Sequence, residues 1–152
     1  MIKEISEKDI EVFINGIKYY FRTSTNEDIV VETPYLTSAK QITVDDYTGI
    51  IGISGERKGF VLVTASEEML RHLVLSLGEE TATQDLIHDV VGEVANTISG
   101  NARRSFGPGF MISVPMVLQG QPERIGASKE TNGYVIPSRW NTFPFQLVVA
   151  LK

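Results

Sequence analysis

Residues 85–106 carry the feature that most constrains the fold of this chain, a long run of apolar residues at helical spacing. At about 100° per residue they fall on one broad side of a helix. These residues are Ile87, Val90, Val91, Val94, Ala95, Ile98, Ala102 and Phe106. The pattern predicts a long helix with one side packed on a core, and Gly107-Pro108-Gly109 is expected to end it.

The opposite side of this predicted helix is polar. Asp89, Glu93 and Asn96 stand at i, i+4 and i+7, within a wedge of roughly 60° that also contains Gly100, and Gly92 lies beside it. A glycine inside a helix costs about 1 kcal/mol relative to alanine, so two of them indicate close approach of a partner's backbone. The alternative interpretation of the polar residues is an ordinary solvated helix face.

The remaining pattern predicts an α+β fold in which long helices pack on a mainly antiparallel sheet, in two layers and one domain over residues 1–152. Two further helices are expected after Ser6 and after Ser66, and a hairpin and three later strands form the sheet. The arm before the hairpin contains Pro34, which keeps it out of a central ladder position. The expected strands are 47–53, 59–64, 111–119, 133–140 and 144–151, with a polar turn at 120–131.

Composition excludes several classes of function. The net charge of −5 and the scattered basic residues argue against nucleic-acid binding. No cysteine is present for a disulfide or a catalytic thiol, and no apolar run approaches the length of a membrane span. Residues 1–4 also lack a hydrophobic signal core, so we expect a cytoplasmic protein without a membrane segment.

The pattern Asp89-x-x-x-Glu93-x-x-Asn96, followed by Gly100-Asn101-Ala102, resembles the helix signature of the CheC/CheX/FliY group of chemotaxis phosphatases. Residues 49–55 and 59–63 also lie where CheX-like proteins have the corresponding hairpin. CheC-like members carry the signature twice and CheX-like members once. Here the first helix has Glu11 and Asn15 at a spacing that does not match, so the chain resembles CheX.

The resemblance implies a phosphatase of a CheY-like response regulator in two-component signalling, acting as a homodimer. The phosphorylated receiver would supply its own Mg²⁺, and the protein would need no cofactor of its own. Asn96 can donate and accept hydrogen bonds at once, which suits it to hold the attacking water in line with phosphorus. Glu93 is an acceptor that can pair with the receiver's lysine. Asp89, Gly92, Gly100 and Asn101 are the predicted partner-binding residues.

Two alternatives remain at this point. A non-catalytic module of the same fold could use the polar face to dock a receiver or a flagellar switch component, and a third possibility is a small-molecule-binding domain with a deep apolar pocket. Arg103 and Arg104 can touch phosphate or an acidic receiver surface. Basic residues in the last turn of a helix are, however, also expected from the helix dipole alone.

Overall fold

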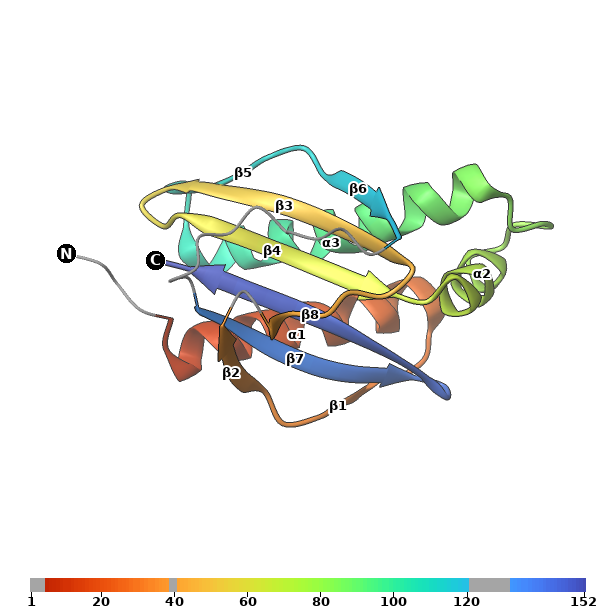
Figure 1. The fold of residues 1–152 in the computed structure, drawn as a ribbon, viewed down its shortest axis with the longest axis horizontal. Coiled ribbons are helices and arrows are strands. Elements are labelled where there is room, and N and C mark those ends of the chain that lie inside the picture. The colour runs from red at the N-terminus through yellow and green to blue at the C-terminus, as the bar shows by residue number, and fades with distance from the viewer. Residues whose placement is uncertain (1–4, 39–40, 121–131) are drawn as a thin grey trace.

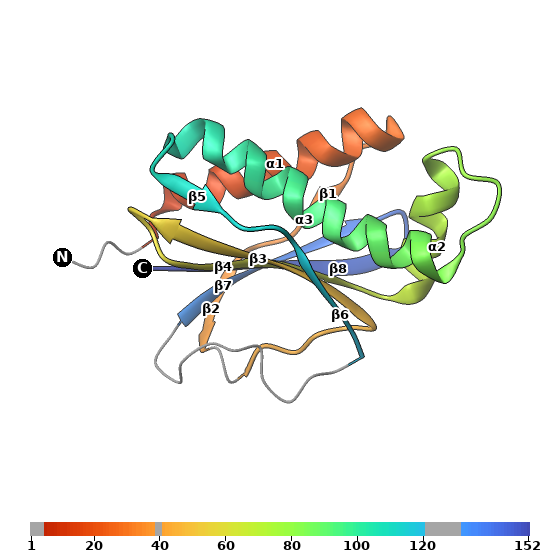
Figure 2. The ribbon, with the colours of Figure 1, turned by 90° about the horizontal axis from the view of Figure 1, so that it is seen from above.

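The computed structural model describes residues 5–38, 41–120 and 132–152 (Figure 1). Its helices lie on one face of an antiparallel sheet, and α1 and α3 run side by side across that face (Figure 2). The α+β prediction is therefore confirmed. The helices are α1 (Glu7–Thr25), α2 (Glu67–Ser76) and α3 (Gln84–Phe106), and the strands are β1 (Val30–Val31), β2 (Tyr35–Ser38), β3 (Tyr47–Gly55), β4 (Gly59–Ala65), β5 (Phe110–Ile112), β6 (Met116–Gln119), β7 (Asn132–Trp140) and β8 (Phe143–Leu151).

The sheet brings together two halves of the chain that each run from a helix to an arm to a hairpin. Its order is β1-β7-β8-β4-β3-β5, with β2 also pairing with β7 and β6 also pairing with β3. The arm that follows α1 therefore pairs with the hairpin of the second half, and the arm that follows α3 pairs with the hairpin of the first. Each half of the chain thus contains a helix followed by strands, and the arms of the two halves are exchanged.

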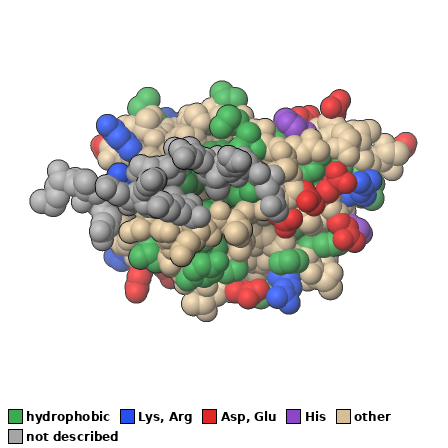
Figure 3. Space-filling model, viewed as in Figure 1, with side chains coloured by type: hydrophobic (Ala, Val, Ile, Leu, Met, Phe, Trp, Pro, Cys, Tyr) green, Lys and Arg blue, Asp and Glu red, His purple; other side chains and the backbone are tan. Residues whose placement is uncertain are grey.

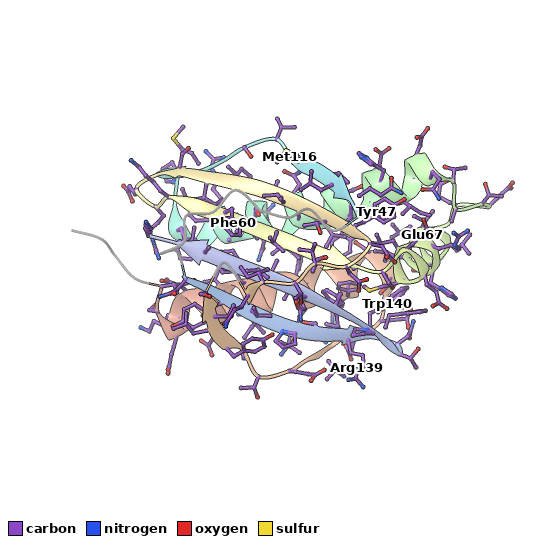
Figure 4. All side chains as sticks on the ribbon, viewed as in Figure 1. Tyr47, Phe60, Glu67, Met116, Arg139 and Trp140 are labelled. Atoms are coloured by element: carbon purple, nitrogen blue, oxygen red, sulfur yellow. The ribbon has the colours of Figure 1, made fainter. Side chains whose placement is uncertain are left out.

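Local signals place both ends of α3. The Thr83 hydroxyl accepts a hydrogen bond from the Leu86 backbone N–H at 3.2 Å, and Gly107 ends the helix at φ 93°, which favours glycine. Tyr47 of β3 donates a hydrogen bond to the side-chain oxygen of Gln84, the first residue of the helix. Gln84 in turn donates to Glu67 at the start of α2, at 3.1 Å, and Figure 4 labels Tyr47 and Glu67 at this end of the sheet.

The main core lies between the helices and the sheet. It includes the buried side of α3 as predicted, with Ile87, Val91, Ala95 and Ile98 fully buried. The middle of α3 lies so close to β3 that a Cβ added at Gly49 would be 2.6 Å from the Val91 carbonyl oxygen. Glycine is therefore required there for close packing of the helix on the strand.

Helices α1 and α3 are antiparallel neighbours. Phe13 lies near the C-terminal end of α3, with its ring centroid 5.9 Å from that of Phe106. Three residues further along α1, a Cβ at Gly16 would stand 3.4 Å from atoms of Ile98 and Asn101. The register then brings the second half of α1 beside the turn of α3 that carries Glu93.

Two sequence-based expectations differ from the structure, and a third agrees with it. The strand predicted at 111–119 is interrupted at Ser113–Pro115, giving β5 and β6. The arm at 25–44 contains two short strands, β1 and β2, at the periphery of the sheet, as Pro34 indicated. The last expected strand has apolar residues at alternate positions, which predicts one buried face: Phe145, Leu147, Val149 and Leu151. The corresponding strand β8 is instead buried on both faces, because Ile50, Leu62, Val135 and Val148 form a second apolar cluster on the face away from the helices. The predicted turn at 120–131 lies, except for Gly120, outside the described residues.

Candidate functional site

Helix α3 places Asp89, Glu93 and Asn96 on its outward face, and we call these three side chains the polar stripe. All three are exposed, as the sequence predicted, and they share one face because i, i+4 and i+7 repeat at nearly whole helical turns. The ion pairs that join described residues use other side chains. The carboxylates and the carboxamide of the stripe are therefore available to a partner.

One side of the polar stripe is bordered by α1. Tyr20 of that helix is 3% exposed, and its pKa is raised to about 12, first by burial and then by the negative charge of Glu93. This effect shows that Glu93 lies near the edge of the stripe that faces α1. Tyr20 belongs to the apolar repeat of the first predicted helix, and no signal within one helix tells which neighbouring helix such a residue faces.

The other side of the stripe is bordered by the β5–β6 segment. Gly92 is buried there, and a Cβ at this position would lie 3.1 Å from Val117 and 3.6 Å from Pro115. We expected a partner's backbone to approach Gly92 closely, but the segment that approaches it belongs to the same chain and contains Pro115 and Val117. Gly100 differs, since nothing lies within 4 Å of its would-be Cβ and it leaves an open spot at the end of the stripe.

Asn101 and the two arginines lie toward the C-terminal end of α3. Asn101 is half-buried, with its side-chain nitrogen directed at Gly16 of α1, and so faces the neighbouring helix. Arg103 and Arg104 are exposed. Together with Gly100 and residues of the following turn, they line a shallow depression of about 400 Å³; the other lining residues are Gly107, Pro108 and Ile112. The surface beyond the Asn96 end of the polar stripe is therefore basic, whereas the stripe begins with the acidic residues Asp89 and Glu93.

The described residues offer few other candidates for chemistry. No group of three or more His, Cys, Asp or Glu side chains among them could hold a metal ion. In the same residues, no helix is both long and apolar enough to cross a membrane. The ring centroid of His72 lies 4.8 Å from that of Phe143, and Trp140 is buried among aromatic rings, so both are accounted for by packing. The polar stripe is the candidate site that the geometry supports best.

The fold defines the class of protein first. The chain is similar to a CheC-like superfamily protein from Shewanella sp. PV-4, with 19% identity, a TM-score of 0.82, and coverage of 97% of this chain and 99% of the other. It is also similar to the chemotaxis protein CheX from Desulfovibrio desulfuricans, with 23% identity, a TM-score of 0.83, and coverage of 95% and 99%. The molecule thus has the CheC-like α+β fold.

The family follows from the sequence. The family model of the chemotaxis phosphatase CheX matches residues 47–139, more than half of the chain and the part that contains the polar stripe, and the chain belongs to this family. A CheX from Borrelia burgdorferi, described in complex with CheY, BeF3 and Mg²⁺, is similar at 19% identity and a TM-score of 0.78, covering 94% of this chain and 97% of that one. No curated protein matches the chain.

Proposed function

We propose that this protein hydrolyses the aspartyl phosphate of a CheY-like response regulator, with Glu93 and Asn96 as the residues that act on the receiver. The observation that supports it best is their placement. The two side chains lie three residues apart on the exposed face of α3, a helix within the region that the CheX family model matches. The Borrelia relative, described with CheY, supports a receiver as the partner.

Asn96 is the proposed water-positioning residue. Its carboxamide can accept a hydrogen bond from a water molecule and donate another to the phosphoryl oxygens, which holds the water in line without removing its proton. The water oxygen then forms a bond to phosphorus while the bond from phosphorus to the aspartyl oxygen breaks. The aspartate leaves as a carboxylate, and the proton of the water passes to the released phosphate or to solvent.

Glu93 is the proposed docking residue. Its carboxylate can accept a charge-assisted hydrogen bond from the receiver's lysine and so fix the register of the two proteins. Mg²⁺ is expected to come with the receiver, where it would neutralise phosphoryl charge. Asp89 borders the same face and can order contacts with a receiver loop. The homodimer implied by the resemblance stays a prediction.

The position of α3 suits this role because the helix is held on several sides. It packs on β3 through Gly49, on α1 through Gly16, and on the β5–β6 segment through Gly92. A side chain on a helix that is fixed in this way is already oriented before the partner arrives. Positioning of this kind is what an acyl phosphate, which is intrinsically reactive, needs most from a catalyst.

The test is phosphate release from phosphorylated CheY-like receivers with Mg²⁺ present, comparing wild type with Asn96→Ala. We expect at least about a 100-fold loss of turnover in the variant, because the water loses its orienting group. Its stability should stay within about 0.5 kcal/mol of wild type, because Asn96 is exposed. Asn15→Ala, which changes an exposed asparagine of α1, is the matched control and should retain full activity.

Glu93→Ala separates docking from positioning. We expect this variant to bind the receiver more weakly and to turn over more slowly, since a charged contact is removed. Unchanged affinity with lost turnover would reverse the roles assigned to Glu93 and Asn96. Receiver binding without any acceleration by wild type would refute the phosphatase and favour the non-catalytic docking module.

A further inference from the structure

Two exposed arginines continue the outward face of α3 beyond the polar stripe. Arg103 and Arg104 follow Asn96 by about two helical turns, and at about 100° per residue the line of the stripe passes between them. Gly100 lies on that line, and nothing lies within 4 Å of its would-be Cβ. Helical side chains lean toward the N-terminal end of their helix, so both arginines extend toward the open spot at Gly100. We call Arg103 and Arg104 the arginine pair.

The arginine pair borders the shallow depression of about 400 Å³ at the C-terminal end of α3. Two of the lining residues are glycines, Gly100 and Gly107, and nothing lies within 4 Å of a would-be Cβ at either one. Pro108 and Ile112 add apolar side chains to the same lining. Part of a partner's surface can therefore enter the depression and lie next to the arginine pair.

The arginine pair has no carboxylate partner among the described residues. The ion pairs between those residues use Arg22, Arg57, Arg71 and Arg139. Neither member of the pair has an acidic residue three or four positions away along α3, whereas Arg71 of α2 pairs in this way with Glu67 at 3.1 Å. The helix dipole favours a basic residue in the last turn but satisfies none of its side-chain N–H donors. Within the described part of the chain, these donors are left for a partner.

Charge changes sign along the outward face of α3. Asp85, Asp89 and Glu93 are exposed before Asn96, and the arginine pair is exposed after it. Figure 3 shows Asp and Glu side chains gathered toward the end of the molecule where α2 lies, and Figure 2 shows α3 running from that end toward β5. Complementary charges steer a partner and fix its register, so this order favours one orientation of a docked protein over the reverse.

A phosphorylated receiver domain presents charges that complement this order. In the proposed function its lysine faces Glu93 and its aspartyl phosphate faces Asn96. Mg²⁺ is bound through one or two carboxylates as well as phosphate oxygens, so the surface around such a pocket carries further negative charge. The Cα atoms of Asn96 and Arg103 are about 10 Å apart along the helix axis, which places the arginine pair beside the pocket and not at phosphorus. A nucleic acid would instead be repelled by Asp89 and Glu93 on the same face.

We propose that the arginine pair binds carboxylates on the receiver surface beside the phosphorylation pocket, and that the order of charge along α3 sets the direction in which the receiver docks. This inference rests on the proposed function for the identity of the partner. Arginine suits the contact because its planar guanidinium can hold a carboxylate through two parallel hydrogen bonds. The arginine pair contributes to association and affinity, while the chemical step stays with the polar stripe.

The experiment removes the two positive charges and measures binding and turnover separately. Arg103→Gln/Arg104→Gln is compared with Arg22→Gln/Arg139→Gln, which makes the same change of charge at exposed arginines of α1 and β7. Figure 4 labels Arg139 near the edge of the sheet formed by β1. The probe is a CheY-like receiver in Mg²⁺, with and without beryllofluoride, titrated calorimetrically. Phosphate release from the phosphorylated receiver gives kcat and KM.

We expect Arg103→Gln/Arg104→Gln to raise Kd and KM by about tenfold at about 0.05 M salt, with kcat at saturating receiver within about twofold of wild type. At about 0.5 M salt the difference should shrink to about twofold, because salt screens charges over a few ångströms there. Arg103→Lys/Arg104→Lys keeps both charges and should recover most of the affinity. The Arg22→Gln/Arg139→Gln variant should bind as wild type does, and thermal unfolding checks that every variant is folded.

Equal affinity of wild type and the Arg103→Gln/Arg104→Gln variant would overturn the proposal and leave the phosphatase standing. A loss of affinity confined to the receiver that carries beryllofluoride would also overturn it, by assigning the arginine pair to the phosphoryl group. The same fold loss with and without beryllofluoride supports contact with receiver carboxylates. Binding that depends on the arginine pair but leads to no phosphate release would support the docking surface while refuting the phosphatase, so the two proposals fail separately.

Discussion

Replacing Gly49 by alanine should push α3 slightly away from the sheet and lower stability and activity together. The new Cβ would stand 2.6 Å from the Val91 carbonyl oxygen and 3.3 Å from the Gly92 Cα. Both are backbone atoms in the middle of a helix, so no flexible side chain can move aside. Restoring even a tight contact of about 3.2 Å requires a local shift of roughly 0.6 Å.

Overpacking of this kind costs about 1–3 kcal/mol, and the rigid neighbours place Gly49→Ala near the upper end of that range. For a chain of this length the melting temperature should fall by roughly 5–10 °C. Because Asn96 lies on the turn after Gly92, a shift of this size should also lower kcat/KM by about tenfold or more. Thermal unfolding and phosphate release measure the two effects on the same preparation.

Gly100→Ala is the matched control on the same helix. Nothing lies within 4 Å of the Cβ it would add, so the variant should be more stable than wild type by about 1 kcal/mol through helix propensity alone. If Gly49→Ala proved as stable as wild type while Gly100→Ala gained stability, the close packing of α3 on β3 would not restrict the helix as argued.

Two further predictions concern buried groups. The folded-state pKa of Tyr20 lies above the unfolded value, so its contribution to the free energy of unfolding is complete below pH 10 and is lost as the pH rises to about 12. Tyr20→Phe should remove up to about 3 kcal/mol of this alkaline fall, measured by urea titration from about pH 9 to 12. If the free energy of unfolding fell equally steeply with pH in the variant and in wild type, the prediction would be contradicted. Buried Arg57 lies 3.4 Å from Asp9, and two of its nitrogens have no partner among the described residues. The free energy of unfolding of Arg57→Met should therefore stay within about 1 kcal/mol of wild type. Asp9→Ala leaves the buried guanidinium without its carboxylate and breaks the capping box with Ser6, so it should lower the free energy of unfolding by at least about 2 kcal/mol in the same titration.

Features that depend on a single element were predictable from sequence. The buried side of α3 and its outward polar stripe follow from helical periodicity. Ser6 and Ser66 were recognisable as caps because capping is a contact within three residues, whereas Thr81 and Thr83 were both candidates for α3 and the structure shows Thr83. The hairpin at β3 and β4 was equally clear, since it joins two short apolar runs across a short glycine-containing loop.

Features that depend on contacts between distant segments were not predictable in the same way. The cost of a glycine at position 92 indicated a close neighbour, but nothing near it in the chain showed that Pro115 and Val117 are that neighbour. The alternation in β8 indicated one buried face, yet its central place in the sheet buries both. The interruption before β6 had a local signal that we did not use, because Pro115 cannot donate to a ladder.

The exchanged arms of the two halves also have a consequence for how the chain reaches its native state. Among the residues that the structure describes, strands β1 and β2 pair with β7 alone, about a hundred residues further along, and β5 and β6 pair with β3 some sixty residues back. Neither half can complete its part of the sheet until the other has formed. Such long-range closure is costly in chain entropy before any pairing is gained, so folding should be cooperative and slow, in the range of milliseconds to seconds. The helix that carries Asn96 is then secured only when nearly the whole chain has folded.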